Sequence, residues 1–279
     1  MTLTELIKAA LKEDMPTGDL TTESLALLPR QGIAKLIAKE DLVLSGTNTF
    51  EQVMLSLDSQ ARLLWKFEEG DVVLNKQIVC TIHGDLIQIL KAERVALNFL
   101  GHLSGIASLT RCFVEKISHT KTKLLDTRKT LPGYRELEKR AVVHGGGHNH
   151  RQNLSEAILI KDNHIAVMGG ITAAVQRIRN HSNKSIEVEA NSLEGVKEAV
   201  QVGAQRILLD NMNNEILKEA LKLIPPHIET EASGNMNLNR VASVAELGVH
   251  YISVGALTHS APCADLSLMF DWQNSITQP

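Results

Sequence analysis

Six short apolar runs recur at regular intervals through the second half of this 279-residue chain, and this repeat constrains the fold more than any other feature. A stretch with helical periodicity separates most neighbouring runs, which is the pattern of alternating strands and helices. Such alternation predicts a parallel sheet joined by right-handed crossovers. The expected strands are Lys123–Leu125, Ala157–Ile160, Ile186–Val188, Ile207–Leu209, Ile228–Thr230 and Tyr251–Val254.

The residues that end these runs indicate where a site would form. Glu189 and Asp210 are 21 residues apart, and Asp210 and Glu231 are again 21 apart, so each step is one strand-helix unit. In an α/β barrel the carboxyl ends of the strands meet at one mouth, where the active site lies. Six units instead of eight predict a barrel that is incomplete or open on one side. The runs end at Asp126, Lys161, Glu189, Asp210, Glu231 and Gly255.

The first part of the chain has a different pattern, and the change falls near residue 105. Residues 33–84 contain short strand patterns and one helical pattern, which predicts an α+β layer. A long helical pattern then covers residues 88–112. Gly101 and Gly105 lie inside it and would permit either a break or close packing.

A segment rich in bases and glycines, residues 126–164, connects and flanks the first two runs. Arg128, Lys129, Arg151 and Lys161 fall at predicted strand ends or in the adjoining glycine-rich loop. A single base of this kind is usually solvated surface charge, but four bases at one mouth suit a ligand with several negative charges. The glycines at 145–147 suit close approach of the backbone to a ligand. The segment therefore predicts a site for a polyanion.

Two carboxylates and three histidines raise the question of a metal. Glu189 and Asp210 could hold Mg²⁺ against a phosphate ligand, bind sugar hydroxyls, or pair with Lys161. The histidines are loosely spaced and have no cysteine partner, so zinc is disfavoured, and His150 is better suited to donating to a carboxylate. These histidines are His144, His148 and His150.

Small residues follow the last two predicted strands. Small residues at this place in a barrel, before helix N-termini, commonly form a phosphate cradle. The chain has no GxxxxGK[ST] loop, no GxGxxG after a strand and no GxSxG turn, so other phosphate and hydrolase sites are disfavoured. The two small-residue segments are Ser233-Gly234-Asn235 and Val254-Gly255-Ala256.

Composition excludes several classes of function. The net charge is −3 and no block of Lys or Arg occurs, which argues against nucleic acid as a partner. The three cysteines are widely spaced, so a disulfide framework is not expected. No signal-peptide pattern and no run of about 20 apolar residues occurs, so we expect no membrane association and a location in the reducing cytoplasm.

Together these blocks resemble the quinolinate phosphoribosyltransferase family, also called nicotinate-nucleotide pyrophosphorylase (carboxylating). The resemblance spans nearly the whole chain, although the first 90 residues match only diffusely. It implies an N-terminal α/β sandwich domain in residues 1–105 and an open, incomplete, TIM-like α/β barrel in residues 106–279, whose last residues return toward the first domain. The matching blocks are residues 93–108, 126–151, 158–165, 186–194, 207–212, 231–235 and 252–262.

The resemblance also implies a reaction: quinolinate and 5-phosphoribosyl-1-pyrophosphate, with Mg²⁺, give nicotinate mononucleotide, pyrophosphate and CO₂, a step of de novo NAD biosynthesis. Glu189 and Asp210 would hold the ribose and the Mg²⁺-pyrophosphate, and Lys129 would stabilise the leaving charge. The family works as a homodimer or an assembly of dimers, in which Arg94 would complete the partner's site. The dicarboxylate would be bound by Arg94, Arg128, His150, Arg151 and Lys161, assisted by Thr127. The 5′-phosphate would be bound by Ser233, Gly234, Asn235, Val254, Gly255 and Ala256, with His259 nearby.

Two alternatives remain open from the sequence. One is the related molybdenum-operon protein of similar fold, which we expect to lack part of this basic set. The other is a barrel that binds a phosphorylated metabolite without catalysis. The complete set of bases and acids argues against it, because a sensor need not keep the groups on the pyrophosphate side.

Overall fold

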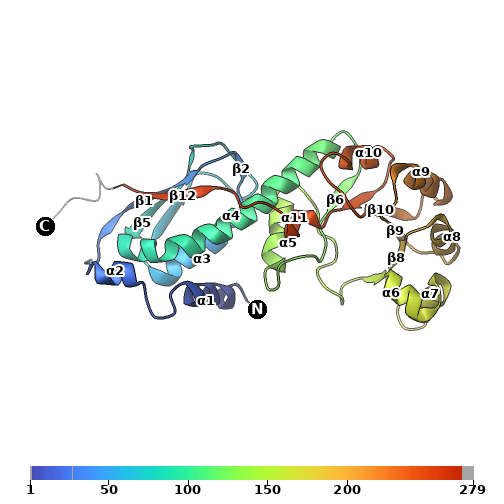
Figure 1. Ribbon diagram of the computed structural model, residues 1–279, viewed down its shortest axis with the longest axis horizontal. Coiled ribbons are helices and arrows are strands. Elements are labelled where there is room, and N and C mark those ends of the chain that lie inside the picture. Colours follow the sequence, from blue (N-terminus) through green and yellow to red (C-terminus); the bar gives the residue numbers. More distant parts are fainter. Residues whose placement is uncertain (1, 27, 272–279) are drawn as a thin grey trace. The chain divides into compact units, whose positions relative to one another are not determined.

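The computed structural model of the protein describes residues 2–26 and 28–271 (Figure 1). Contacts divide them into two compact units. The N-terminal unit takes the described parts of Met1–Arg111, Leu131–Gly146 and Ala261–Pro279, and the barrel unit takes Cys112–Thr130 and Gly147–Ser260. The domain boundary expected near residue 105 stays a prediction. Among the described helices, none combines the length and the apolar character that crossing a membrane requires.

The N-terminal unit is built on an antiparallel four-stranded sheet of order β12-β1-β5-β3. These strands are β1 (Gln31–Ala38), β3 (Arg62–Trp65), β5 (Ile78–Asp85) and β12 (Leu266–Phe270). The last strand, β12, pairs with β1 in the register Leu36↔Leu268, so the end of the described chain completes the first sheet. A two-stranded ladder joins β2 (Leu42–Val43) and β4 (Val72–Val73).

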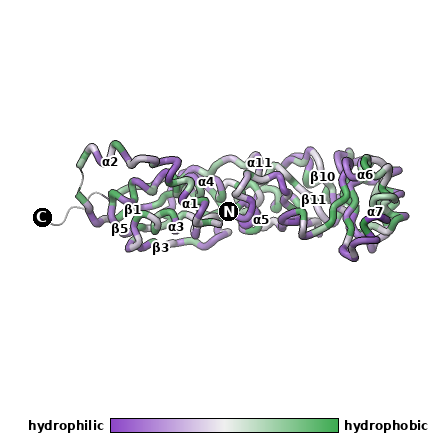
Figure 2. The backbone as a smooth tube through the Cα atoms, turned by 90° about the horizontal axis from the view of Figure 1, so that it is seen from below, coloured by the Kyte–Doolittle hydropathy of each residue, from purple (hydrophilic) through white to green (hydrophobic). Residues whose placement is uncertain are grey.

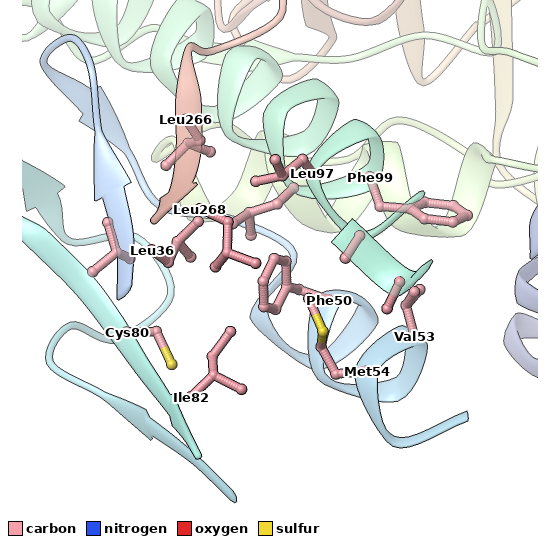
Figure 3. Close-up of a cluster of buried hydrophobic side chains, with 14 of the residues drawn as sticks. Leu36, Phe50, Val53, Met54, Cys80, Ile82, Leu97, Phe99, Leu266 and Leu268 are labelled. Carbon is pink, nitrogen blue, oxygen red and sulfur yellow. The ribbon is translucent and has the colours of Figure 1, made fainter. Parts of the chain in front are cut away.

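Helices bury the apolar face of this sheet. The helices of the unit are α1 (Leu3–Asp14), α2 (Leu20–Ser24), α3 (Thr47–Leu57), α5 (Arg135–His144) and most of α4 (Leu86–Ile117). Figure 3 shows Phe50 of α3 facing Leu36 and Leu268 of the sheet, and all three side chains are buried. Burying a side chain of this size contributes about 2 kcal/mol, so this aliphatic cluster is the main source of the unit's stability.

The helix α4 runs without a break past Gly101 and Gly105, so the glycines serve close packing. A Cβ atom at Gly105 would lie 1.8 Å from the carbonyl oxygen of Pro262, and one at Gly101 would lie 2.9 Å from that of Ala264. The Ala264 amide donates to the Gly101 carbonyl at 2.9 Å. The glycines therefore let the segment before β12 lie directly against the helix.

The barrel unit contains the six strands that the apolar runs predict, in one parallel sheet of order β6-β11-β10-β9-β8-β7. Although β6 and β7 are consecutive in the chain, they form the two edges of this sheet. The barrel is therefore open between them, as expected. The strands are β6 (Lys123–Leu125), β7 (Ile158–Ile160), β8 (Ile186–Ala190), β9 (Arg206–Asp210), β10 (Glu229–Ser233) and β11 (Tyr251–Ser253).

Most helices of the barrel unit lie along the outer side of the sheet (Figure 1). Each longer helix is amphipathic: α7 buries Ile171, Ala174 and Val175 and exposes Arg177, and the hydropathy changes along the helix in Figure 2. The helices are α6 (Asp162–Met168), α7 (Ile171–Arg179), α8 (Leu193–Gln201), α9 (Asn214–Leu223), α10 (Val241–Ala245) and α11 (Ala256–His259).

Candidate active site

A cavity of about 730 Å³ lies at the carboxyl ends of the barrel strands. Its walls bring together every residue predicted for the site except Arg94. The predicted residues in the walls are Thr127, Arg128, Lys129, His150, Arg151, Lys161, Glu189, Asp210, Ser233, Gly234, Asn235, Val254, Gly255, Ala256 and His259. Arg94 is exposed on α4 in the N-terminal unit and is not part of these walls. The individual roles of all these residues stay predictions.

The glycine-rich segment extends the edge of the sheet and so positions two site residues. The His148 amide donates to the Leu124 carbonyl at 2.8 Å, and the Asp126 amide donates to the His148 carbonyl at 3.1 Å. Asp126 is fully buried, and its Oδ1 accepts the His150 amide at 2.8 Å. These bonds hold residues 148–151 beside β6, which places His150 and Arg151 in the cavity wall.

Two guanidinium groups, those of Arg128 and Arg151, form the basic part of the cavity. Arg151 is only 9% exposed, and its NH1 donates to the Ala157 carbonyl at 2.8 Å. Burial, followed by the nearby charge of Arg128, lowers the pKa of Arg151, while Glu187 acts in the opposite direction. Two guanidinium groups in the wall of one cavity favour binding of an anion with more than one negative charge.

Lys161 and Glu189 form an ion pair at the mouth, with Nζ 3.1 Å from Oε2. The lysine side chain is 48% exposed, so the pair is solvated and adds little to stability. Both side chains can therefore exchange this contact for contacts with a ligand. Asp210, on the next strand, accepts from the Asn211 amide side chain at 2.6 Å.

Lys129 is fixed against α11. Its carbonyl accepts the Thr258 hydroxyl at 2.7 Å, and its amide donates to the Thr127 hydroxyl at 3.1 Å. A Cβ atom at Gly255 would lie 2.9 Å from Cδ of Lys129, so glycine at this position leaves room for the lysine stem. The ammonium group consequently lies in the same cavity as the loops that follow β10 and β11.

The loops after β9 and β10 form a tight polar turn. Gly234 and Asn235 have φ angles of 91° and 52°, and a Cβ atom at Gly234 would lie 2.2 Å from Oδ1 of Asn211. Asn235 tolerates this left-handed backbone better than most residues, and its side-chain amide donates to Asn211 Oδ1 at 3.1 Å. Arg240 binds the turn from behind through the carbonyls of Gly234 and Met212.

A layer of charged side chains lies deeper in the barrel, on strands β8, β9 and β10. Arg206 donates to Oε2 of Glu229 at 2.9 Å and 2.6 Å, and its guanidinium carbon lies 4.2 Å from the centre of the Tyr251 ring. Glu231 is fully buried and Glu187 is 7% exposed. Arg206 therefore binds Glu229 closely and lies 3.7 Å from Oε2 of the buried Glu231.

His150 lies next to these acids. Its Nε2 is 3.3 Å from Oε2 of Glu187 and 3.5 Å from Oε2 of Glu231. Within the described residues these three side chains also form the one group whose ligand atoms are close enough to share a metal ion. However, Nδ1 of His150 accepts the Arg151 amide at 2.7 Å, so Nε2 carries the proton of the neutral ring and faces the acids as a donor. This tautomer fits a hydrogen bond to a carboxylate and not a metal.

Sequence reasoning missed several residues of the cavity. Glu231 was recognised as a strand end but was not assigned to the site, although it lies in the wall. Glu187 contacts His150 but is not part of the wall, and its position in the sequence predicted no role. A period of two was the available signal, because Glu187 and Glu189, like Glu229 and Glu231, occupy the same face of one strand. The other wall residues that were not predicted are Leu159, Asp162, Leu208, Asn211, Met236 and Ser253.

The fold and the site define an incomplete α/β-barrel protein with a cavity lined by basic side chains at its strand ends. Comparison with known proteins identifies the family. The family model "Quinolinate phosphoribosyl transferase, C-terminal domain" matches residues 106–269, and the corresponding N-terminal domain model matches residues 19–104. This chain belongs to the quinolinate phosphoribosyl transferase family.

Individual relatives are similar over nearly their whole length. A probable nicotinate-nucleotide pyrophosphorylase [carboxylating] of Bacillus subtilis is 38% identical over 95% of this chain and 92% of its own length. The Synechocystis protein of the same name is 41% identical over 92% of this chain and 89% of its own. The structure of the nicotinate-nucleotide pyrophosphorylase from Francisella tularensis superimposes with a TM-score of 0.92 at 38% identity, covering 96% of both chains.

Proposed function

We propose that this protein transfers a phosphoribosyl group from 5-phosphoribosyl-1-pyrophosphate to quinolinate and releases pyrophosphate and CO₂, so that nicotinate mononucleotide forms for NAD biosynthesis. The observation that carries this proposal is that the wall of one cavity contains both Arg128 and Arg151 and also the polar turn at Gly234. Quinolinate carries two carboxylates, and the sugar substrate carries phosphates. The cavity offers separate cationic and backbone-rich regions for them.

The roles of the residues follow from this division. Arg128, Arg151 and Lys161 bind the two carboxylates and orient the pyridine nitrogen, with His150 and Thr127 beside them. The turn at 233–235 and the segment 254–256 bind the 5′-phosphate, with His259 close to the latter. Bond breaking at ribose C1 builds positive charge on the sugar and negative charge on the leaving pyrophosphate. Glu189 and Asp210 stabilise the former and Lys129 the latter.

Mg²⁺ fits the acidic side of the cavity. Glu189 and Asp210 provide carboxylate oxygens, which are the ligands that this ion prefers, and they would hold it together with the pyrophosphate. The ion supplies charge neutralisation of the leaving group.

The site is completed across a homodimer in this proposal. Arg94 is exposed on α4, where it is available to another subunit, and it would add a further cation to the carboxylate-binding region of the partner. A protein of this kind would work in the cytoplasm, with small-molecule substrates and with neither nucleic acid nor a membrane as partner.

The decisive test is an assay of the purified protein with quinolinate, phosphoribosyl pyrophosphate and Mg²⁺, in which nicotinate mononucleotide and pyrophosphate are both measured. We expect both products, and a fall of about a hundredfold in kcat for Lys129→Ala, since one preorganised charge in such a site contributes about 3 kcal/mol. Lys197→Ala on α8, outside the cavity wall, is the matched control. Binding of both substrates without product would instead favour a sensor, and turnover of nicotinate in place of quinolinate would contradict the proposed acceptor.

A further inference from the structure

The proposed reaction has a chemical requirement that none of the roles above meets. When the carboxylate leaves ring carbon 2 as CO₂, the electron pair of the broken bond stays on that carbon and must take up a proton. Resting on the proposed function, we propose that Glu231 donates this proton and is the acid of the decarboxylation step.

Glu231 is placed where such a donor must be. It lies in the cavity wall next to His150, and therefore next to the region proposed to bind the carboxylates. On β10 it precedes Ser233 by two residues, so both side chains occupy the same face and Glu231 lies one step deeper in the barrel. It is fully buried, so water competes little as a proton source.

The hydrogen bonds around Glu231 leave room for a proton on its carboxyl group. The closest donors of Arg206 are bonded to Glu229, and the distance from Arg206 NH1 to Glu231 Oε2 is 3.7 Å. Within the described residues, both oxygens of Glu231 and Oε1 of Glu187 are buried without a hydrogen bond of good geometry, although the Ser253 hydroxyl lies close enough to Glu231 to lower its pKa. Two buried carboxylates thus face one N–H of His150, an arrangement that favours protonation of one of them.

His150 itself is a poorer place for this proton. Burial lowers the pKa of His150, while Glu187 and Glu231 outweigh burial and raise it. A second proton on the ring would have to sit on Nδ1, which already accepts the Arg151 amide at 2.7 Å. The geometry therefore directs the additional proton to the carboxyl pair, with His150 as a positioning residue.

The acidity of Glu231 matches the task. Burial, and then the charge of Glu187, raise the pKa of Glu231 to about 7, while His150, Ser253 and Arg206 act in the opposite direction. A general acid is most effective when its pKa is close to the working pH, because a large fraction is then protonated and the acid is still strong enough to transfer its proton.

Decarboxylation and protonation of ring carbon 2 consume one proton in total. The bond from ring carbon 2 to the carboxylate breaks and CO₂ leaves. The electron pair left on the carbon is stabilised by the adjacent ring cation and takes the proton from the carboxyl oxygen of Glu231. Glu231 becomes a carboxylate and regains a proton from solvent before the next turnover, so one proton is consumed in each cycle.

The experiment compares release of pyrophosphate and of CO₂ in wild type, Glu231→Gln and Glu231→Asp. Glutamine keeps the shape but cannot donate this proton. We expect Glu231→Gln to release pyrophosphate within a few fold of wild type, to release CO₂ about a hundredfold more slowly, and to accumulate the carboxylated mononucleotide. The aspartate variant, which remains an acid, should recover part of the CO₂ release.

Equal loss of both products in Glu231→Gln, or no loss of either, would overturn the role in proton donation. Failure of the proposed function itself looks different, because wild type would then release no pyrophosphate. If circular dichroism shows that Glu231→Gln does not fold, the pH profile of CO₂ release by Glu187→Gln serves as the test of the proposal. Removing this charge lowers the pKa of Glu231, so the alkaline limb of the CO₂-release profile should move to lower pH, and an unmoved limb would overturn the proposal.

Discussion

Asn235 occupies a backbone conformation that few side chains adopt, and its place in the proposed phosphate turn makes it a test of that turn. With a φ of 52°, a β-branched residue would be strained by about 1 to 2 kcal/mol, whereas glycine adopts the same conformation freely. Asn235→Val should therefore lower the midpoint of thermal unfolding and raise KM for the sugar substrate.

The matched variant Asn235→Gly separates conformation from side-chain chemistry. It keeps the backbone angle but loses the amide bond to Asn211. If Asn235→Gly unfolds near the wild-type temperature and still has a raised KM, the amide contributes to binding. Valine and glycine variants with the same stability would contradict the argument from strain. Differential scanning calorimetry and substrate titration measure the two quantities.

At the same scale, the sequence predicted Glu189 and Asp210 as site residues but gave no role to Glu187 or Glu231. Glu189 and Asp210 end their predicted strands, and the carboxyl ends of barrel strands form the mouth. Glu187 lies inside β8, and Glu231, although it follows the predicted strand Ile228–Thr230, lies inside β10. Their importance depends on which side chains face them across the barrel, and that is a property of the folded sheet alone.

The next scale is the element, and here α4 depends on close contact with the segment before β12. Gly105→Ala would place a Cβ atom 1.8 Å from the Pro262 carbonyl, a clash with backbone that neither side can relieve cheaply. We expect a loss of at least about 1 to 3 kcal/mol in the free energy of unfolding. Chemical denaturation monitored by circular dichroism measures it.

Gly195→Ala is the control, because this glycine also lies in a helix, α8, but has room. Its Cβ atom would have the Ser192 hydroxyl 3.4 Å away as its nearest neighbour, an ordinary contact. Alanine in a helix interior is favoured over glycine by about 0.5 to 1 kcal/mol, so this variant should be neutral or more stable. Equal destabilisation of both variants would mean that packing against Pro262 is not the cause.

Element boundaries were predicted less well than the elements themselves. All six barrel strands formed, but their ends differ from the expected ones: the run Ile228–Thr230 corresponds to β10, which spans Glu229–Ser233. Strand ends depend on pairing with neighbouring strands, which the local sequence pattern does not contain. The long helical pattern at 88–112 extends to Leu86–Ile117, since packing sustains a helix beyond its strongest periodicity.

For the whole molecule, the proposed sharing of each site between two subunits predicts complementation between inactive variants. Arg94→Ala and Lys129→Ala would each damage every site of the proposed homodimer. In a mixed dimer one site receives both damaged residues and the other receives neither, so up to half of the wild-type activity per mixed dimer should return. Mixing the two variants under conditions that exchange subunits, with mass spectrometry to quantify mixed dimers, measures this. Mixed dimers without activity would place Arg94 outside the partner's site.

The parts of the architecture that are local and repeated could be predicted from the sequence. Each strand-helix unit can be recognised within about twenty residues, so the repeat predicted the parallel sheet and its open side. The pairing of β1 with β12 could not be predicted from the spacing of the apolar runs, because Leu36 and Leu268 are separated by most of the chain. Only the resemblance to a family indicated that the last residues return.

This pairing has a consequence for synthesis on the ribosome. The sheet of the N-terminal unit gains its edge strand only after β12 has been made, and the segment that packs against Gly101 and Gly105 also comes last. Until then β1 carries an unpaired edge, which is a template for association with other chains. The barrel strands are translated in the interval, so the unit that begins the chain is the one whose folding must finish last.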